Sequence, residues 1–244
     1  ELCEFRGDEV GMIFQDPMTS LNPTMTVGKQ IMESLMIHKK LDKKAAKEEA
    51  VNMLKLVNIP SPEKRIDNYP HEMSGGMRQR VMIAIALACN PNVLIADEPT
   101  TALDVTIQAQ IMDLMMELKT KMNTAIILVT HDLGVVNETS DNVAVVYAGK
   151  IIEYGSRYDL FKNPLHPYTN GLFGALPNMN LDSNRLNPIE GLPPDPTNLP
   201  EGCAFAPRCP YAKDVCRCGE IPTIEVTAGH LCECIRINKI LGGK

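Results

Sequence analysis

The stretch of residues 74–104 constrains the fold of this chain most, because it joins a glycine pair at a helix start to a pair of acids at a strand end. Ser74 is a good N-cap, since its side-chain oxygen can accept a hydrogen bond from a free backbone N–H of the first turn. Gly75 and Gly76 carry no side chain, so a ligand can approach the backbone closely. The free N–H groups and the positive end of the helix dipole favour an anion. The pattern therefore predicts a phosphate site at this helix start.

The helix that begins there is predicted to be buried. Its residues 81–89 are almost wholly apolar. Arg78 and Arg80 are expected to add positive charge near the helix start. Asn90 and Pro91 end the helix, because proline cannot easily continue one.

A short apolar run at residues 93–96 is typical of a parallel strand that is buried on both faces. Asp97 and Glu98 follow it, at the end where open α/β sheets bind their ligands. Two adjacent acids there would be costly unless they held a metal or a polarised water. Asp97 can take Mg²⁺, usually through water, and Glu98 can act as a general base on an attacking water. Asp104 is predicted to open the next helix.

Two further strands are predicted, and each is followed by a polar residue. Residues 10–14 precede Gln15, and residues 124–129, read as another buried strand, precede His131. Taken alone, Gln15 would be an ordinary turn residue and His131 a structural histidine. A histidine that follows a strand and faces Asp97 and Glu98 also suits a contact with a γ-phosphate.

The remaining segments predict helices, a loop, a hairpin and a linker. The expected helices cover residues 26–37, 39–57 and 105–121, with a loop at 58–71, a hairpin around Gly149 and Lys150, and an extended linker at 177–202.

Several motifs, in this order and spacing, resemble those of ABC ATPases. SGGMRQR, LIADEPTTALD and the Thr130-His131-Asp132 triplet resemble the signature, Walker B, D-loop and switch-histidine motifs. QDPMTSLNP resembles the Q-loop of the peptide-importer branch, and NPLHPYTNGLFGALP resembles the segment that follows the core in that branch. The resemblance covers nearly the whole chain. It points to the ATP-binding subunit of an oligopeptide/dipeptide importer.

The resemblance implies an α/β fold, a P-loop NTPase core of the ABC type with a helical subdomain. The core would span residues 1–162, with the helical subdomain at about 17–90, and a small cysteine-rich extension would span 163–244. Glu98, His131 and Gln15 would be catalytic, and Asp97 and Gln15 would hold Mg²⁺. The residues implied to bind ATP are Ser74, Gly75, Gly76, Met77, Asp104 and His131, with Met77 in place of the common glutamine.

The chain begins at Glu1 and contains no GxxxxGK[ST] loop, which cradles the phosphates in P-loop ATPases. An ABC ATPase normally carries that loop upstream of the first motif found here. We therefore expect a fragment whose N-terminal portion is missing and which is inactive by itself.

Six of the eight cysteines lie near the C-terminal end of the chain. A cytosolic chain should not hold them as disulfides, so they suggest Zn²⁺ or an iron–sulfur cluster. GCAFAPRCPYAKDVC resembles a module in which importer ATPases bind a [4Fe–4S] cluster. The implied ligands are Cys203, Cys209, Cys216 and Cys234, with Zn²⁺ as the alternative metal. Cys234 is preferred over Cys232 because it lies four residues beyond His230, as in the family. Reduced thiols in a small packed tail are the structural alternative.

The function implied by the resemblance is ATP hydrolysis that powers import of di- or oligopeptides, at the cytoplasmic side of the cell membrane. The implied partners are a second ATPase subunit, homologous or identical, a permease pair and, through it, an extracytoplasmic solute-binding protein. Nickel or another solute is the alternative cargo. A soluble ABC ATPase acting on DNA or ribosomes is a further alternative, but the net charge of −6 does not suggest a nucleic-acid partner. A metal-sensing module with an inactive ATPase is a third, and the intact Asp97-Glu98 pair argues against it.

Overall fold

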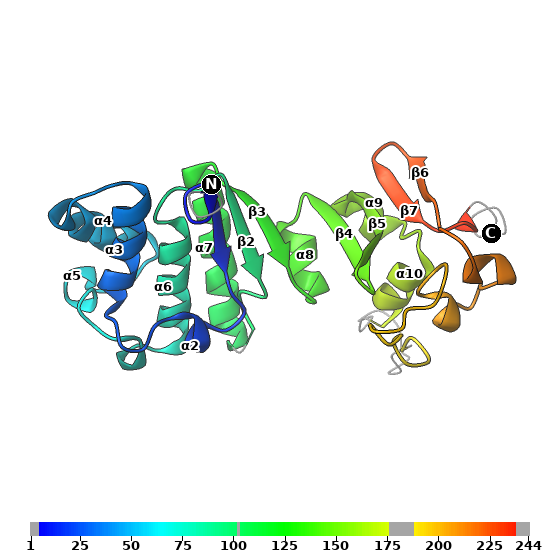
Figure 1. Cartoon of the computed structure of the whole chain (residues 1–244), viewed down its shortest axis with the longest axis horizontal. Helices are drawn as coiled ribbons and strands as arrows, with labels where there is room; N and C mark the ends of the chain where they lie inside the picture. The colour runs from blue at the N-terminus through cyan, green and yellow to red at the C-terminus, as the bar shows by residue number, and fades with distance from the viewer. Residues whose placement is uncertain (1–4, 102, 176–187, 238–244) are drawn as a thin grey trace. The chain divides into compact units, whose positions relative to one another are not determined.

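The computed structural model describes residues 5–101, 103–175 and 188–237, except the side chains of residues 17 and 18. The chain divides into two compact units, Glu1–His131 and Asp132–Lys244 (Figure 1). Within the described residues, no helix combines the length and hydrophobicity that a membrane span requires.

The first unit is built on a parallel sheet with the strand order β1-β2-β3. The strands are β1 (Val10–Ile13), β2 (Val93–Asp97) and β3 (Ala125–Val129). β2 pairs in parallel with both neighbours, as the apolar run predicted. The predicted burial on both faces is wrong for one face: Leu94 and Ala96 are buried, whereas the alternate residues of β2 are partly exposed.

β3 departs from the prediction of a buried strand. Ile127 is 54% exposed and Val129 is 49% exposed. Within the described sheet β3 pairs only with β2, so it forms an edge. An apolar run alone cannot tell whether another element covers the strand.

The first unit also contains several helices. They are α2 (Pro17–Ser20), α3 (Val27–His38), α4 (Lys43–Leu56), α5 (Pro62–Arg65), a 3₁₀ turn at Pro70–Glu72, α6 (Gly75–Leu87) and α7 (Val105–Met122). α6 packs against α3, α4, α7 and β1, and it is buried as predicted, with Val81, Ile83 and Ala84 fully inaccessible. Because α6 has partners on several sides, a helix that is apolar all round is stable there.

Two predictions about the helical region need correction. The second helix begins at Lys43 and not at residue 39, because Lys40 takes a φ of 56° and Asp42 caps the helix by accepting a hydrogen bond from Ala45 N at 2.8 Å. The segment 58–71, predicted as loop, contains α5 and most of the 3₁₀ turn.

The second unit is built on an antiparallel sheet with the order β4-β5-β7-β6. Its elements are α8 (Leu133–Thr139), β4 (Asn142–Tyr147), β5 (Lys150–Ser156), α9 (Arg157–Lys162), α10 (Pro167–Gly174), 3₁₀ turns at Ala206–Arg208 and Asp214–Arg217, β6 (Thr223–Thr227) and β7 (His230–Glu233). The predicted β4–β5 hairpin is confirmed. Its turn residues Ala148 and Gly149 both have positive φ, which suits the right-handed twist of the strands. The cysteine-rich tail adds β6 and β7 to this hairpin, a pairing that the sequence did not predict.

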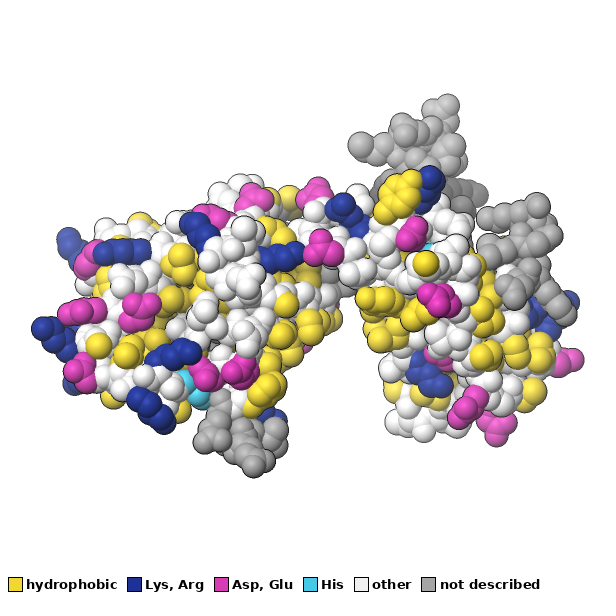
Figure 2. Space-filling view, turned by 90° about the horizontal axis from the view of Figure 1, so that it is seen from above, with side chains coloured by type: hydrophobic (Ala, Val, Ile, Leu, Met, Phe, Trp, Pro, Cys, Tyr) yellow, Lys and Arg dark blue, Asp and Glu magenta, His cyan; other side chains and the backbone are white. Residues whose placement is uncertain are grey.

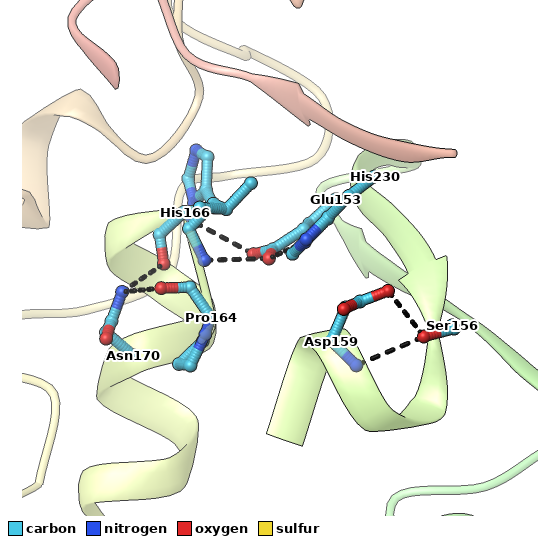
Figure 3. A network of polar contacts seen from close by, with 8 residues as sticks. Glu153, Ser156, Asp159, Pro164, His166, Asn170 and His230 are labelled. Carbon is cyan, nitrogen blue, oxygen red and sulfur yellow. Dashed lines mark hydrogen bonds and ion pairs between the residues drawn. The ribbon is translucent and has the colours of Figure 1, made fainter. Parts of the chain in front are cut away.

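A buried carboxylate joins three segments of the second unit (Figure 3). Glu153 on β5 is 1% exposed, and its oxygens accept hydrogen bonds from Leu165 N and His166 N, both at 2.8 Å. His230 Nε2 on β7 lies 2.9 Å from the same carboxylate. Buried charges are stable only when paired and hydrogen-bonded, so this network fixes the tail strand and the start of α10 to the hairpin.

Candidate functional site

Three polar residues meet at one edge of the parallel sheet. Gln15 lies just beyond β1, Glu98 directly follows β2, and His131 lies just beyond β3. Gln15 Nε2 donates a hydrogen bond to Glu98 Oε2 at 2.8 Å. His131 Nδ1 lies 2.9 Å from Glu98 Oε1. The carboxyl ends of parallel strands share an edge, so the strand order brings together the three residues that the resemblance implied to be catalytic.

The backbone around Glu98 is held in an uncommon conformation. Its φ is 43°, in the left-handed region that non-glycine residues rarely adopt. Glu98 N donates to Val129 O at 2.9 Å, and Thr101 N donates to Glu98 O at 3.1 Å. Such strain persists only where the surroundings hold it, and it is frequent at functional sites.

The Glu98 carboxylate is kept ionised by its donors. His131 and then the Thr101 hydroxyl, which donates to Oε2 at 2.8 Å, lower the pKa of Glu98, and Gln15 contributes less. The Glu98 side chain is 24% exposed and that of His131 is 79% exposed, so a water molecule can reach both. An ionised, accessible carboxylate with fixed neighbours can accept a proton from water. Thr101 lies in the turn after the two acids, and no motif or spacing in the sequence marked it as a site residue.

Asp97 ends β2 beside Glu98 and is partly exposed. Among the described residues, no group of three or more His, Cys, Asp and Glu side chains is arranged to hold a metal ion. Mg²⁺ commonly uses one or two protein ligands together with waters and substrate phosphates. Asp97 and the amide of Gln15 offer oxygen ligands of the kind that such a site needs.

The predicted helix start is formed as the sequence indicated. Ser74 caps α6, and its Oγ accepts a hydrogen bond from Met77 N at 3.4 Å. A Cβ on Gly75 would meet only Leu103 Cδ2 at 3.8 Å, whereas a Cβ on Gly76 would lie 2.9 Å from Ile107 Cγ2. Gly76 is therefore needed for packing of α6 against α7, a reason that the sequence alone did not reveal.

Three charged residues around this helix bind the backbone of the chain itself. Asp104 caps α7, as predicted, by accepting from Ile107 N at 3.0 Å. Arg78 Nε donates to Pro70 O at 2.7 Å, and Arg80 Nη1 donates to Val57 O at 3.0 Å. The guanidinium of Arg80 thus binds the C-cap of α4, and the expected charge near the start of α6 stays a prediction.

The four cysteines implied as metal ligands line one small cavity in the second unit. Cys203, Cys209, Cys216 and Cys234 face it together with residues that include His166. Cys232 does not line this cavity; it is fully buried in an apolar cluster with Leu165 and Ile237, against which Cys234 also packs. Cys218 is exposed, and its Sγ lies 3.7 Å from Asp214 O.

The cavity offers hydrogen-bond donors to sulfur. Burial raises the pKa of Cys203, Cys209 and Cys234, while backbone N–H groups lower it in each case. The donors are Phe205 and Ala206 for Cys203, Tyr211 for Cys209 and Arg236 for Cys234. Burial is the larger effect, so the pKa of each of these three thiols is raised on balance, and the described cysteines are not arranged to hold a metal ion.

Comparison with known proteins identifies the family. Residues 2–101 match the ABC transporter family model, and residues 152–216 match the model of the oligopeptide/dipeptide transporter C-terminal region. The oligopeptide transport ATP-binding protein OppD of Escherichia coli (strain K12) is 54% identical over 236 residues, which cover 97% of this chain and 70% of that protein. The chain belongs to the oligopeptide/dipeptide ABC transporter ATP-binding protein family.

Other members of this transporter family give the same result. The oligopeptide transport ATP-binding protein AppD of Bacillus subtilis (strain 168) is 53% identical over 96% of this chain and 71% of its own length. The dipeptide transport ATP-binding protein DppD of the same organism is 57% identical over 88% of this chain and 64% of its own length. The chain thus spans roughly two thirds of the length of these relatives.

Solved structures confirm the ABC-type fold of this chain. A dimeric post-hydrolysis state of the ATP-binding cassette MJ0796, bound to ADP and Pi, has a TM-score of 0.56 and 28% identity over 64% of this chain and 66% of that one. cbiO1 from Clostridium perfringens is part of the ABC transporter complex cbiONQ. Its TM-score is 0.56 at 33% identity, and the match covers 64% of this chain and 60% of cbiO1. The predicted α/β ABC ATPase core is therefore confirmed.

Proposed function

We propose that this chain is the hydrolytic part of an ATP-binding subunit that powers import of di- or oligopeptides. The observation that carries the proposal is the Glu98 carboxylate, held between Gln15 and His131 at the carboxyl edge of a parallel sheet. Glu98 takes a proton from the water that attacks the γ-phosphate. Gln15 orients that water, and His131 contacts the γ-phosphate.

Magnesium fits the oxygen ligands at this edge. Asp97, usually through water, and Gln15 would hold the ion, and Mg²⁺ bound there would neutralise charge on the phosphates. The hydrogen bonds of His131 and Thr101 keep Glu98 ionised, so the base is ready at neutral pH.

A second ATPase subunit, identical or homologous, would complete each nucleotide site. ATP would lie between the phosphate loop of one subunit and Ser74, Gly75, Gly76 and Met77 of the other, with Asp104 at the start of α7 close to the same interface. Binding of ATP closes the pair, and hydrolysis reopens it. The related cassette MJ0796, solved as a dimer with ADP and Pi, supports this arrangement. The opening and closing would drive a permease pair, to which an extracytoplasmic binding protein delivers the solute.

The relatives named for dipeptide and oligopeptide transport favour peptides over nickel or another solute. They also favour a place on the cytoplasmic side of the membrane, bound to the permease. A soluble ATPase that acts on DNA gains no support from the surface. On the face seen in Figure 2, Lys and Arg side chains are interspersed with Asp and Glu and do not form a basic stripe.

Transport by the full-length protein tests this function. The ATPase, its partner subunit and the permease pair are reconstituted in proteoliposomes with the binding protein, and uptake of labelled dipeptide, oligopeptide and Ni²⁺ is measured. We expect ATP-dependent peptide uptake that Glu98→Gln abolishes. Uptake of Ni²⁺ without uptake of peptide would show that nickel is the transported solute. ATP-driven uptake that Glu98→Gln leaves unchanged would contradict the assignment of the base.

We also propose that Cys203, Cys209, Cys216 and Cys234 hold a [4Fe–4S] cluster with a structural role, since peptide import needs no redox step. Their common cavity and the backbone N–H groups directed at three of the sulfurs support this proposal. Small modules with little apolar surface often obtain much of their folding free energy from a metal. Zn²⁺ is the rival metal, because four thiolates suit it as well.

Metal analysis after anaerobic purification separates these alternatives. We expect about four iron atoms and four sulfides per chain, the content of a [4Fe–4S] cluster. About one equivalent of zinc without sulfide would show that the site holds Zn²⁺ and not a cluster. The absence of both metals would show that the cysteines are reduced thiols. Cys234→Ala should lose the metal, whereas Cys232→Ala should retain it because Cys232 lies outside the cavity. The reverse result would make Cys232 the fourth ligand.

A further inference from the structure

A buried glutamine joins the signature helix to the turn that carries the proposed base. Gln79 lies on α6 and is 1% exposed. Its Nε2 donates a hydrogen bond to Pro99 O at 2.5 Å, across 20 residues of sequence. A buried polar side chain is costly unless it is hydrogen-bonded, and this contact supplies a partner for the Gln79 amide.

Pro99 is the residue next to the strained Glu98. It is buried, so its carbonyl oxygen needs a donor from within the protein. Two backbone hydrogen bonds also hold this turn. Glu98 N donates to Val129 O, and Thr101 N donates to Glu98 O. The Gln79 amide is therefore the contact that fixes the turn from the side of α6.

The other end of this connection is the start of α6, where we propose that phosphate binds. Gln79 follows Gly75 by about one helical turn, so the amide and the helix start move together as parts of a rigid element. A displacement at Ser74 and Gly75 would therefore reach Pro99 through the hydrogen bond of Gln79, and Pro99 follows directly after Glu98.

We propose that Gln79 is a positioning residue, which holds the Glu98–Pro99 turn in the conformation that aims the base. The proposal rests on the proposed function, because it assumes that Glu98 is the base. It assigns a kinetic role to the glutamine of the SGGMRQR motif that does not require contact with nucleotide. It also gives a physical connection within one chain between the helix start, which would face the partner's nucleotide, and the base of its own site.

Gln79→Met in the full-length subunit, assembled with its transporter, tests this role. Methionine has a similar length and volume but has no donor for Pro99 O. Gln30→Met is the matched control, because Gln30 is also buried and its Nε2 donates to Asn22 O and Met25 O at 3.0 and 3.1 Å. We expect Gln79→Met to lower kcat about tenfold or more with KM for ATP within about twofold, whereas Gln30→Met costs comparable thermal stability and changes kcat less than about threefold.

The double variant with Glu98→Gln distinguishes positioning from a general structural effect. If Gln79 acts through Glu98, Gln79→Met should not lower the residual hydrolysis of Glu98→Gln further, because no base is left to position. An equal fall in both backgrounds, or a wild-type kcat for Gln79→Met, would overturn the proposal. Wild-type turnover of Glu98→Gln would instead refute the proposed function.

A second variant covers the case in which Gln79→Met does not fold. Gln79→Glu has the same size, and its buried acid can donate an O–H to Pro99 O only when protonated. Its turnover relative to wild type should recover as the pH is lowered. A ratio that does not change with pH would count against the hydrogen bond as the source of the effect.

Discussion

His131 Nδ1 lies 2.9 Å from Glu98 Oε1, although 33 residues separate them in the sequence. The contact exists because β2 and β3 are parallel neighbours, so the residues that follow them meet at one edge. It is also the largest cause of the lowered pKa of Glu98. One pairing between strands therefore sets both the position and the charge of the proposed base.

The two signature glycines should respond differently to alanine. Gly75→Ala should leave the free energy of unfolding unchanged or raise it by up to about 1 kcal/mol, because the new methyl group has room and alanine favours helix. Gly76→Ala should lower it by about 1–2 kcal/mol, since the methyl group crowds Ile107. Denaturant melts measure both. A loss of ATP turnover by Gly75→Ala at unchanged stability would report its contact with nucleotide, and equal destabilisation would contradict the packing account.

The buried Glu153 should be a major source of stability in the second unit. Glu153→Gln leaves His230 Nε2 and two backbone N–H groups with a weaker set of acceptors, so the free energy of unfolding should fall by about 3 kcal/mol. Glu220→Gln, an exposed control, should change it by less than about 0.5 kcal/mol. A loss below about 1 kcal/mol for Glu153→Gln would show that the network is not needed.

His166 should make the second unit sensitive to acid. Burial lowers the pKa of His166 to about 4, from an ordinary value of 6.5. Between these pH values the unfolded chain binds a proton at His166 that the folded chain does not. The free energy of unfolding is therefore unaffected by His166 above pH 6.5 and falls as the pH drops towards 4. From pH 7 to pH 5 the free energy of unfolding should fall by about 2 kcal/mol because of His166.

His166→Asn should remove this acid-dependent loss. Asparagine keeps an acceptor for Tyr168 N, which the side chain of His166 binds as the N-cap of α10, but it does not titrate. Melts of the variant and of wild type at the two pH values provide the comparison. An equal loss in both proteins would assign the acid sensitivity to other groups.

Local rules predicted much of the first unit. The strand β2, the buried α6 and the starts of α6 and α7 follow from an apolar run and from the caps Ser74 and Asp104, which act within a few residues. The exposure of β3 and the start of α4 at Lys43 were missed. The exposure of β3 depends on which elements pack against it, which its own residues do not show. The start of α4 depends on the left-handed conformation of Lys40, which a run of lysines does not predict.

Motifs predicted the members of the site but not how they are held. The resemblance named Gln15, Glu98 and His131, and the structure brings them into contact. The support from Thr101 and Gln79 depends on the shape of one turn, which spacing does not give. The pairing of β5 with β7 could not be predicted either, because the two strands lie far apart in the sequence.

ATP turnover by Glu98→Gln in the full-length, assembled transporter is the most direct test of the account. Glutamine keeps the size of the side chain but cannot accept the proton, so steady-state turnover should fall by about 10²-fold or more while ATP binding is retained. Glu117→Gln, an exposed control on α7, should stay within about twofold of wild type. Wild-type turnover by Glu98→Gln would contradict the role of Glu98 as the base.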